Sequence, residues 1–442
     1  MRGFYKGTII LVIAAFFGEC VEFLINMILA RELHEEGMGQ YMSLLPIFFL
    51  IYVLASLELH ISVSKFVAEN KPALHFNLLI HALKMAAVVG LVICAIMPII
   101  LTFLPLMDRY HPHIKWLFVG LIPIVAFSSI ARGYFMGVQQ MSKIALSNFF
   151  KKIFQFGLLL LIFTLFQYNQ KDSLLMAFYV LIGSEFLVFI YLFSLFMVHL
   201  RVMKRSSHTL SSGKEARKKL LEVSLPTMGL RIFHAITNAI QPFLIHAALL
   251  SAGFGAVLAT EHFGMLTGVA MTIGFFPAFI AHSLMIMLIP NVSEAYNKRD
   301  KEKLRDLLQK SISVTILYGV PAVFIIYFFA EPLTSLFFSS TSASLYLKLL
   351  CPYFLFHFFI IPMQAYLIGL GLVKDAFVHT VWSHIVAFII MYILGSQPAF
   401  NMEGIIIGMN TGAVLITLMH YVTICHKIGI NLWLTKSKQN VY

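Results

Sequence analysis

Long apolar stretches alternate with short polar ones along the whole chain. At about 20 residues, each stretch is long enough to cross the roughly 30 Å hydrocarbon core of a bilayer as a helix. The pattern therefore predicts an all-α membrane protein with about twelve transmembrane helices and no separate soluble domain. We expect these helices at 8–30, 41–62, 85–106, 114–137, 150–167, 174–199, 221–249, 263–289, 312–330, 345–370, 376–396 and 404–425.

Composition agrees with this pattern. Of the 442 residues, 60% are hydrophobic and only 12% are charged, whereas a soluble domain carries about 25% charged residues. Such a chain cannot cover a water-exposed surface. The first apolar stretch is too long for the apolar region of a signal peptide and no small-residue cleavage site follows it, so we expect it to remain in the mature protein.

Basic residues are distributed unevenly between the predicted loops. If the N-terminus is cytoplasmic, the cytoplasmic segments hold 25 of the 32 Lys and Arg residues, the outer segments hold five, and Arg132 and Arg231 lie inside spans. This satisfies the positive-inside rule and predicts that both termini are in the cytoplasm. We expect the membrane to be the plasma membrane. The net charge of +12 is then explained by topology, and we expect no nucleic-acid partner.

The longest basic loop divides the spans into six and six. This loop covers 201–220 and predicts an amino-terminal lobe at 1–200 and a carboxyl-terminal lobe at 221–442, with a short cytoplasmic tail. We expect this loop to link two six-helix lobes.

Two pairs of similar segments suggest that the lobes arose by duplication. Residues 68–71 and 295–298 follow the second and eighth spans, and residues 133–137 and 365–369 close the fourth and tenth. Because six spans is an even number, both lobes enter from the same side, and a pseudo-twofold axis along the membrane normal would relate them. Chance similarity between apolar sequences is the alternative.

Polar side chains recur at helical spacing in the first and seventh spans. A charged side chain at the centre of a membrane helix costs roughly 2.5–3.5 kcal/mol, so each is a candidate functional residue. We expect both stripes to line a water-filled cavity between the lobes. The stripes consist of Glu19, Glu22 and Asn26 in the first span and Thr227, Arg231, His234, Asn238 and Gln241 in the seventh.

We expect the cavity to bind an anionic group. Arg231, assisted by Arg132 of the fourth span, would hold a phosphate or pyrophosphate through charge-assisted hydrogen bonds. Further substrate contacts are expected from polar residues of the same two stripes, namely His234, Asn238, Gln241 and Asn26.

Acidic residues would couple transport to an ion. Glu19, Glu22 and Glu58 are expected to bind H⁺ or Na⁺, whose release accompanies the lobe movement. Two alternatives remain: a permanent ion pair between a first-span glutamate and Arg231, and a snorkelling position for Glu58 near the cytoplasmic boundary. Weaker intramembrane candidates are His60 and Glu185.

Other polar groups are given structural roles. The four cysteines, without CxxC spacing, are expected to be packing residues, which predicts neither disulfides nor a metal site. His282 and His357 stand alone on apolar faces and are expected to be interior histidines. A segment beginning at Leu304 carries one leucine-rich face and one charged face, which predicts an amphipathic helix on the inner leaflet whose partner is membrane lipid.

Several segments resemble landmarks of the multidrug/oligosaccharidyl-lipid/polysaccharide (MOP) flippase superfamily, in its polysaccharide-transporter branch. Within that branch the chain looks closest to the stage V sporulation protein B group and its shorter YkvU-like members. The resemblance extends over essentially the full chain. The segments that carry it are RELHEEGMGQY at 31–41, SKFVAE at 64–69, RGYFMGVQ at 132–139 and PNVSEA at 290–295.

The resemblance implies a function as well as a fold. It implies the fold of the MATE exporters and lipid II flippases, alternating access by a monomer without a cofactor, and flipping of undecaprenyl-pyrophosphate-linked sugars for the cell wall or spore envelope. No GxxxxGK[ST] phosphate loop occurs, so ATP hydrolysis is not expected. A cation-coupled multidrug exporter of the same superfamily is the nearest alternative. A membrane-embedded transferase is more remote, because the outer loops carry no cluster of catalytic side chains.

Overall fold

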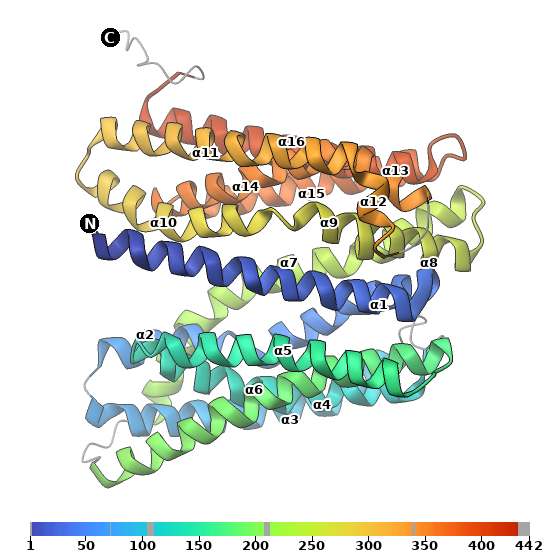
Figure 1. Cartoon of the computed structure of the whole chain (residues 1–442). Helices are drawn as coiled ribbons and strands as arrows, with labels where there is room; N and C mark the ends of the chain where they lie inside the picture. Colours follow the sequence, from blue (N-terminus) through green and yellow to red (C-terminus); the bar gives the residue numbers. More distant parts are fainter. Residues whose placement is uncertain (1, 71, 104–109, 207–212, 338–340, 432–442) are drawn as a thin grey trace. The chain divides into compact units, whose positions relative to one another are not determined.

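The chain is folded into helices in the computed structural model, which describes residues 2–70, 72–103, 110–206, 213–337 and 341–431 (Figure 1). No strand occurs among these residues, and the predicted all-α class is confirmed. The helices are α1 (Arg2–Ser56), α2 (Leu59–Glu69), α3 (Pro72–Thr102), α4 (Pro112–Gly137), α5 (Met141–Leu165), α6 (Gln170–Ser206), α7 (Gly213–Ser251), α8 (Ala256–Gly264), the π-helix η2 (Met265–Ala270), α9 (Met271–Phe275), α10 (Ala278–Asn297), α11 (Lys301–Phe328), α12 (Ala330–Thr334), α13 (Thr341–Leu349), α14 (Cys351–Gly369), α15 (Val373–Gly395) and α16 (Asn401–Ile428).

Twelve helical segments among the described residues are long and apolar enough to cross a membrane. This number equals the number of predicted spans because two differences cancel: two predicted spans merge into one segment, and one predicted span divides into two. The predicted spans 8–30 and 41–62 fall in one segment, Phe16–Glu69, because the polar residues 31–40 between them are also helical and only backbone breaks interrupt the helix. One such break is His34, with φ 57° and ψ −175°.

The second difference is at the eighth predicted span. Instead of one helix at 263–289, the structure has two apolar segments, Ala256–Phe275 and Ala278–Asn297. Pro277 lies at the interruption between them, which is expected because proline cannot donate the backbone hydrogen bond that would continue the helix.

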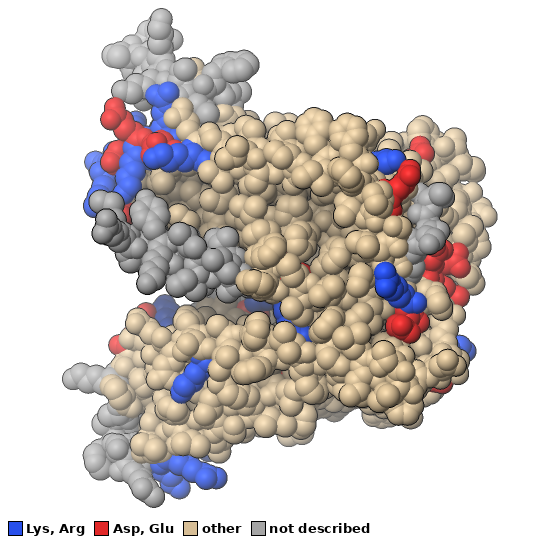
Figure 2. Space-filling view, in the orientation of Figure 1, with Lys and Arg blue, Asp and Glu red and all other residues tan. Residues whose placement is uncertain are grey.

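Charged side chains keep to the helix ends on the visible surface. In Figure 2, most Lys, Arg, Asp and Glu side chains lie near the ends of the helices, and between the ends the surface is mainly of other residues, with a few Lys or Arg atoms visible at the centre. Many of these surface side chains are large and apolar, for example Leu317, Phe328 and Trp382. Such a surface suits contact with lipid, because apolar side chains that face lipid tails are not exposed to water.

The chain forms two compact units that interleave in the sequence. Unit 1 comprises Met1–Gly39 and Gln241–Tyr442, and unit 2 comprises Gln40–Ile240. The units differ from the predicted lobes 1–200 and 221–442, because α1, which is interrupted at His34, and α7 each contribute residues to both units. Most of the predicted linker 201–220 is likewise helical, as the end of α6 and the start of α7; residues 207–212 lie outside the described part.

Aromatic packing explains why the start of α1 belongs to unit 1. The ring of Phe16 contacts Phe276 and Phe279, and that of Phe23 contacts Phe276 and Phe337, with centroid distances between 5.2 and 6.1 Å. Edge-to-face pairs of this kind add to the energy of apolar burial. They attach the first half of α1 to α9, α10 and the segment after α12.

Each unit contains the same helix contact, as the predicted duplication requires. In unit 2, a Cβ added at Gly137 of α4 would lie 2.6 Å from Cβ of Val67 on α2; in unit 1, one added at Gly369 of α14 would lie 2.8 Å from Cβ of Val292 on α10. Only glycine permits backbones to approach so closely at these positions. Val67 and Val292 are 225 residues apart, so the predicted pairing of 68–71 with 295–298 is shifted by two residues.

Both α4 and α14 also end in the same hydrogen-bonded cap. The backbone N–H groups of Gln139 and Gln140 donate to Met136 and Phe135, and those of Gly371 and Leu372 donate to Ile368 and Leu367. In each cap the residue after the bend is left-handed, with φ 59° at Gln139 and 78° at Gly371. This Schellman geometry recurs at an offset of 232 residues, as the predicted equivalence of 133–137 and 365–369 requires; the same cap also ends α7 and α10.

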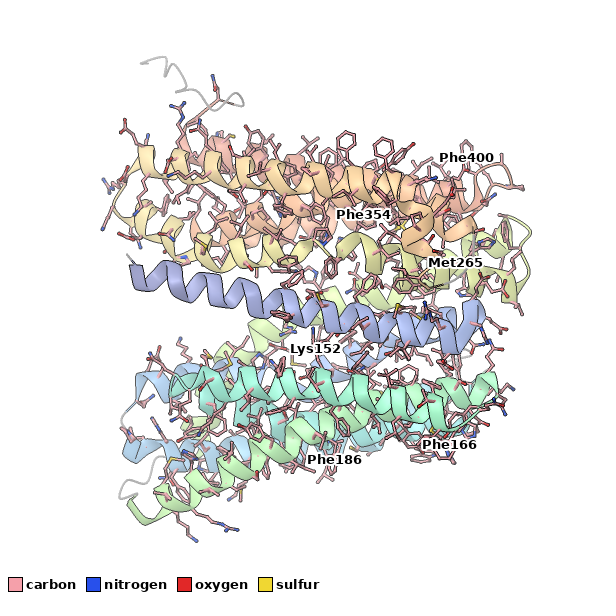
Figure 3. All side chains as sticks on the ribbon, viewed as in Figure 1. Lys152, Phe166, Phe186, Met265, Phe354 and Phe400 are labelled. Atoms are coloured by element: carbon pink, nitrogen blue, oxygen red, sulfur yellow. The ribbon has the colours of Figure 1, made fainter. Side chains whose placement is uncertain are left out.

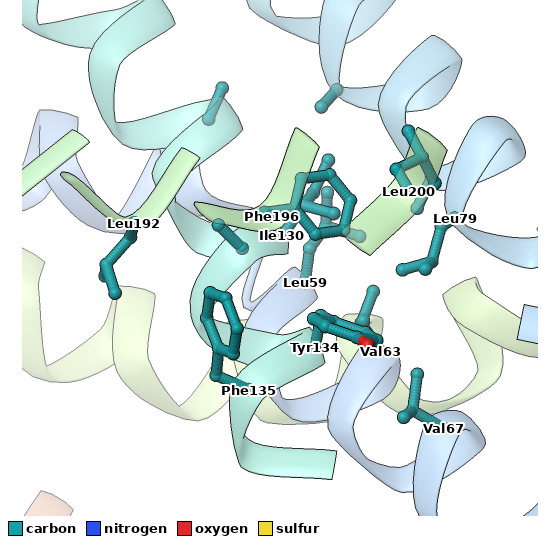
Figure 4. Packing of buried hydrophobic residues seen from close by; sticks show 14 of the residues in the cluster. Leu59, Val63, Val67, Leu79, Ile130, Tyr134, Phe135, Leu192, Phe196 and Leu200 are labelled. Carbon is teal, nitrogen blue, oxygen red and sulfur yellow. The ribbon is translucent and has the colours of Figure 1, made fainter. Parts of the chain in front are cut away.

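Buried apolar clusters hold each unit together. In unit 2, side chains of α2, α3, α4 and α6 meet around Leu59, Tyr134 and Phe196 (Figure 4). In unit 1, α10, α11, α14 and α16 meet around Val292 and Tyr366. Phe354, labelled in Figure 3, packs directly on Gly274 of α9 in the same unit.

The prediction of an amphipathic helix on the inner leaflet is wrong. Its residues form the first turns of α11, and the apolar face is covered by protein: Leu304 and Leu308 are buried in the cluster around Tyr366. The Tyr366 hydroxyl also donates a 2.7 Å hydrogen bond to the Leu304 carbonyl. Sequence periodicity shows that a face is apolar but does not show what covers it.

Candidate anion-binding site

A helix break in unit 2 positions the central carboxylate. Helix α1 ends at Ser56 and α2 begins at Leu59, and the intervening Leu57 and Glu58 are both left-handed, with φ 47° and 51°. This conformation costs a leucine or a glutamate roughly 1–2 kcal/mol each, so neighbouring groups must stabilise it.

Ser129 of α4 bridges the two sides of this break. Its hydroxyl donates to the Ser56 carbonyl at 3.2 Å and accepts from the His60 backbone N–H at 3.1 Å. Both groups would otherwise lack helical partners inside the membrane. One turn further along α4, Gly133 lets the backbone of His60 approach, since a Cβ there would lie 2.8 Å from the His60 Cα.

Glu58 forms an ion pair with Arg231 of α7. The Glu58 side chain is 1% exposed, and its Oε2 accepts from Arg231 Nη1 at 3.3 Å. The Ser56 hydroxyl is 3.4 Å from Oε1, and His60 Nε2 lies 3.7 Å from Oε2. A carboxylate this deep requires such partners, because an unpaired buried charge is strongly unfavourable. The predicted snorkelling position of Glu58 is therefore wrong.

Arg132 supplies a second guanidinium. It is half-buried on α4, next to Gly133, and its buried Nε has no hydrogen-bond partner in the described part of the chain. The charges of Arg132 and Arg231 both act on His60. The two arginines that the sequence singled out thus lie around one small region of unit 2, and one has an unused donor.

A second ion pair lies beside them. Lys151 of α5 donates to Glu185 Oε1 of α6, with side-chain exposures of 25% and 7%. Sequence reasoning treated Glu185 as a weak candidate and counted Lys151, at the start of the predicted span 150–167, among the basic residues of the cytoplasmic segments. Because α5 begins ten residues before Lys151, at Met141, Lys151 lies within this helix instead. Lys152, labelled in Figure 3, is its neighbour on α5.

Tyr52 lies near both ion pairs. Four charged side chains act electrostatically on its hydroxyl: Glu185, Lys151, Arg132 and Arg231. This set, with Glu58 and His60, is called the basic cluster below. It holds three cationic side chains and two carboxylates, so after pairing one guanidinium, that of Arg132, remains available for an anion.

The rest of the α7 stripe is divided between the units. Arg231, His234 and Asn238 belong to unit 2, and Gln241 belongs to unit 1. Arg231 and Asn238 are exposed, whereas His234 and Gln241 are half-buried. The Thr227 side chain lies outside the described part. That this stripe lines a substrate cavity stays a prediction.

The acidic stripe of α1 belongs to unit 1. Glu19, Glu22 and Asn26 are all half-buried, on a helix whose Phe16 and Phe23 pack against α9, α10 and the segment after α12. A permanent pair between a first-span glutamate and Arg231 is not needed to explain the arginine, because Glu58 already pairs with it. The substrate and ion-coupling roles of the stripe stay predictions.

Among the described residues, no three His, Cys, Asp or Glu side chains converge as metal ligands, and none of the four cysteines forms a disulfide. Cys351 and Cys425 are buried, as packing residues would be.

Sequence comparison relates the chain to sporulation proteins. A sequence model described as "Polysaccharide biosynthesis protein" matches residues 4–295, and one described as "MatE" matches 266–393. The chain is 54% identical over 435 residues to "Sporulation protein YkvU" of Bacillus subtilis, covering 98% of both. It is 30% identical to "Stage V sporulation protein B" of the same organism, covering 97% of this chain and 85% of that protein.

Solved structures share the fold. An inward-facing multidrug resistance MATE family transporter of the MOP superfamily aligns with a TM-score of 0.75 at 17% identity, over 96% of each chain. A Pyrococcus furiosus MOP transporter, described by a binding pocket of reverse polarity that suggests a different function, aligns with a TM-score of 0.67 at 19% identity, over 96% of this chain and 95% of that one.

Proposed function

Because the chain belongs to the polysaccharide biosynthesis protein family, we propose that it is an alternating-access flippase for a lipid-linked anionic precursor. It is a multi-pass membrane transporter of the MOP superfamily. The proposed substrate is an undecaprenyl-pyrophosphate-type lipid carrying a cell-wall or spore-envelope oligosaccharide. The names of its relatives support a role in sporulation.

The basic cluster is the observation that carries this proposal. A pyrophosphate has several charged oxygens that accept hydrogen bonds, and arginine is the side chain best suited to bind them. Arg132 has a buried donor without a partner, and half of the Arg231 side chain is exposed beyond its contact with Glu58. Both arginines can therefore gain contacts when an anion arrives.

Glu58 gives a means of ion coupling. While Glu58 is ionised, it competes with the substrate phosphate for Arg231. Protonation of Glu58 would free the guanidinium for the substrate, and loss of the proton would favour substrate release. We assign proton coupling to Glu58 and propose that Glu19 and Glu22 contribute from unit 1. The proposed topology places both termini in the cytoplasm, with a monomer as the transporting unit.

A cation-coupled multidrug exporter is the second candidate, favoured by the MATE fold. The two differ in the charge that the site attracts. Binding of a fluorescent organic cation and of a fluorescent isoprenoid pyrophosphate to the purified protein would be measured, and protons would be tested for displacement of the bound cation. Binding of the pyrophosphate but not of the cation supports the flippase. Binding of the cation, displaced by protons, with no pyrophosphate binding, would reject it.

A further inference from the structure

Helices α15 and α16 of unit 1 pack along a regular seam of small residues. The two helices lie side by side (Figure 1) and are joined by a short loop, so they run antiparallel. Cβ atoms added at three glycines of α16, spaced four residues apart, would meet α15 atoms at 2.4–2.9 Å. Gly404 faces Leu394 and Gly395, Gly408 faces Met391 and Ala387, and Gly412 faces Ala387 and Ser383.

Two histidines continue this register. Steps of four residues along α16 lead from Gly412 to His420, and matching steps backwards along α15 lead from Ala387 to His379. The two imidazoles meet there, with the Nδ1 atoms 3.0 Å apart and the ring centroids 5.1 Å apart. His420 is fully buried and His379 is 8% exposed. The seam thus brings two titratable rings together at its end.

The hydrogen bonds of His379 and His420 determine which of their ring nitrogens carry protons. A 3.0 Å Nδ1 to Nδ1 contact requires one protonated and one unprotonated nitrogen. The Thr423 hydroxyl lies 3.3 Å from His379 Nε2, whereas the buried His420 Nε2 has no partner in the described part of the chain. If His420 donates through Nδ1, His379 carries its proton on Nε2 and donates to Thr423, and His420 Nε2 remains an unused acceptor. The reverse arrangement would leave a buried N–H without a partner.

We propose that the His379–His420 pair is a proton-binding site in which His420 Nε2 accepts the proton. One added proton keeps the Nδ1 contact and makes it charge-assisted, because a cationic His420 still donates to a neutral His379. A second proton would place two N–H groups against each other and break the contact. The pair therefore holds one extra proton at most while α15 and α16 remain packed.

Proton binding at this site is linked to opening. A cation on the fully buried His420 needs water or another partner at Nε2, which the closed seam does not provide. Protonation therefore favours separation of the start of α15 from the end of α16, and closure favours release of the proton. As a coupling site for transport, the pair rests on the proposed function; as a proton-binding site, it does not.

Neighbouring charges are few. Asp375, one turn before His379 on α15, is the carboxylate whose charge acts on His379. Helix α14, which packs against both helices, has no Asp, Glu, Lys or Arg; its titratable groups are Cys351, Tyr353, His357 and Tyr366. Helix α16 itself ends in His426 and Lys427. The remaining elements that pack on α16 bring Lys348 of α13 and the charged first turns of α11, from Lys301 to Lys310.

The test is hydrogen–deuterium exchange of the full chain in lipid nanodiscs, at about pH 5.5 and about pH 8, on either side of the ordinary histidine pKa of about 6.5. Rates are corrected for intrinsic pH dependence. We expect peptides covering 376–383 and 417–425 to exchange about tenfold faster at the lower pH in the unmodified protein. His420→Gln should abolish this difference.

His384→Gln is the matched control. His384 lies on the same helix, but its Nδ1 bonds to the Thr380 carbonyl of its own helix, so its replacement should leave the pH response intact. Thr423→Val keeps both rings and should shift the midpoint of the response, which preserves the test if His420→Gln does not fold. An equal pH response in His420→Gln and the unmodified protein would overturn the proposal.

A second readout is the ¹⁵N spectrum of labelled histidine. We expect scalar coupling between the two Nδ1 atoms across their hydrogen bond; two uncoupled rings would overturn the proposal. Neither measurement requires transport, so failure of the flippase assignment would leave these results unchanged.

Discussion

Glu58 and Arg231 lie 173 residues apart in the sequence, yet Arg231 Nη1 is 3.3 Å from Glu58 Oε2 in unit 2. The pair is asymmetric, because the carboxylate is 1% exposed and the guanidinium is 51% exposed. An anion arriving from the open side of Arg231 would therefore compete with a fixed carboxylate for the guanidinium. Five predictions follow from this arrangement and from the packing around it.

Replacing Glu58 by Gln should strengthen anion binding. The substitution removes the carboxylate charge that competes for Arg231 but keeps the size of the side chain and one accepting oxygen. Partly exposed ion pairs contribute up to about 1 kcal/mol, so the dissociation constant for an isoprenoid pyrophosphate should fall about three- to fivefold. Titration calorimetry at two pH values would measure this. The pH dependence of binding should also diminish; weaker binding by the variant would contradict the competition.

Separating Lys151 from Glu185 should destabilise unit 2. Lys151→Met leaves the carboxylate of Glu185 buried without its partner, and loss of one member of a buried pair costs about 3 kcal/mol, at the low end of the usual range because Lys151 is one-quarter exposed. The double variant Lys151→Met/Glu185→Leu should recover most of this loss. Thermal unfolding in detergent is the measurement. Equal melting temperatures for the single and double variants would argue against a buried pair.

The equivalent glycine contacts, one within unit 1 and one within unit 2, should both be disrupted when a side chain is added. Gly137→Ala and Gly369→Ala force apart helices whose facing valines lie within 3 Å of the added Cβ, at a cost of about 1–3 kcal/mol. Gly157→Ala on α5 is the control, since nothing lies within 4 Å of its added Cβ. Because alanine favours a helix, this variant should melt at the same temperature or higher. A reversed order of melting temperatures would refute the packing.

The hydroxyl of Tyr366 should contribute to the stability of unit 1. Tyr366→Phe removes the buried hydrogen bond to the Leu304 carbonyl and should cost about 1 kcal/mol. Tyr392→Phe, on the exposed surface of α15, serves as the comparison and should change little. If both variants melt alike, the start of α11 is not held in place by this bond.

The sequence was sufficient to predict the helical membrane class, because apolar periodicity and span length have a direct physical basis. It also identified Arg132, Arg231 and Glu58, since charges within apolar spans are unfavourable unless they have a function. Duplication was visible at 133–137 and 365–369, where close glycine packing restricts the sequence.

Other features depend on long-range contacts that the local pattern does not encode. The break at Leu57 and Glu58 carries no glycine or proline signal, because Ser129 stabilises it from another helix. The ion pair of Lys151 was not predicted, because its partner, Glu185, lies on the next helix. The His379–His420 contact was equally hidden, since each histidine stands alone on its own helix.

Flipping of a defined lipid-linked pyrophosphate in proteoliposomes tests the central claim most directly. We predict that Arg231→Ala reduces the flipping rate at least about tenfold, which corresponds to roughly 1.4 kcal/mol, while the variant unfolds at a temperature close to that of the unmodified protein. Lys348→Ala, on α13 and outside the basic cluster, should flip at the unmodified rate. Normal flipping by a folded Arg231→Ala variant would contradict the assignment of the basic cluster as the anion-binding site.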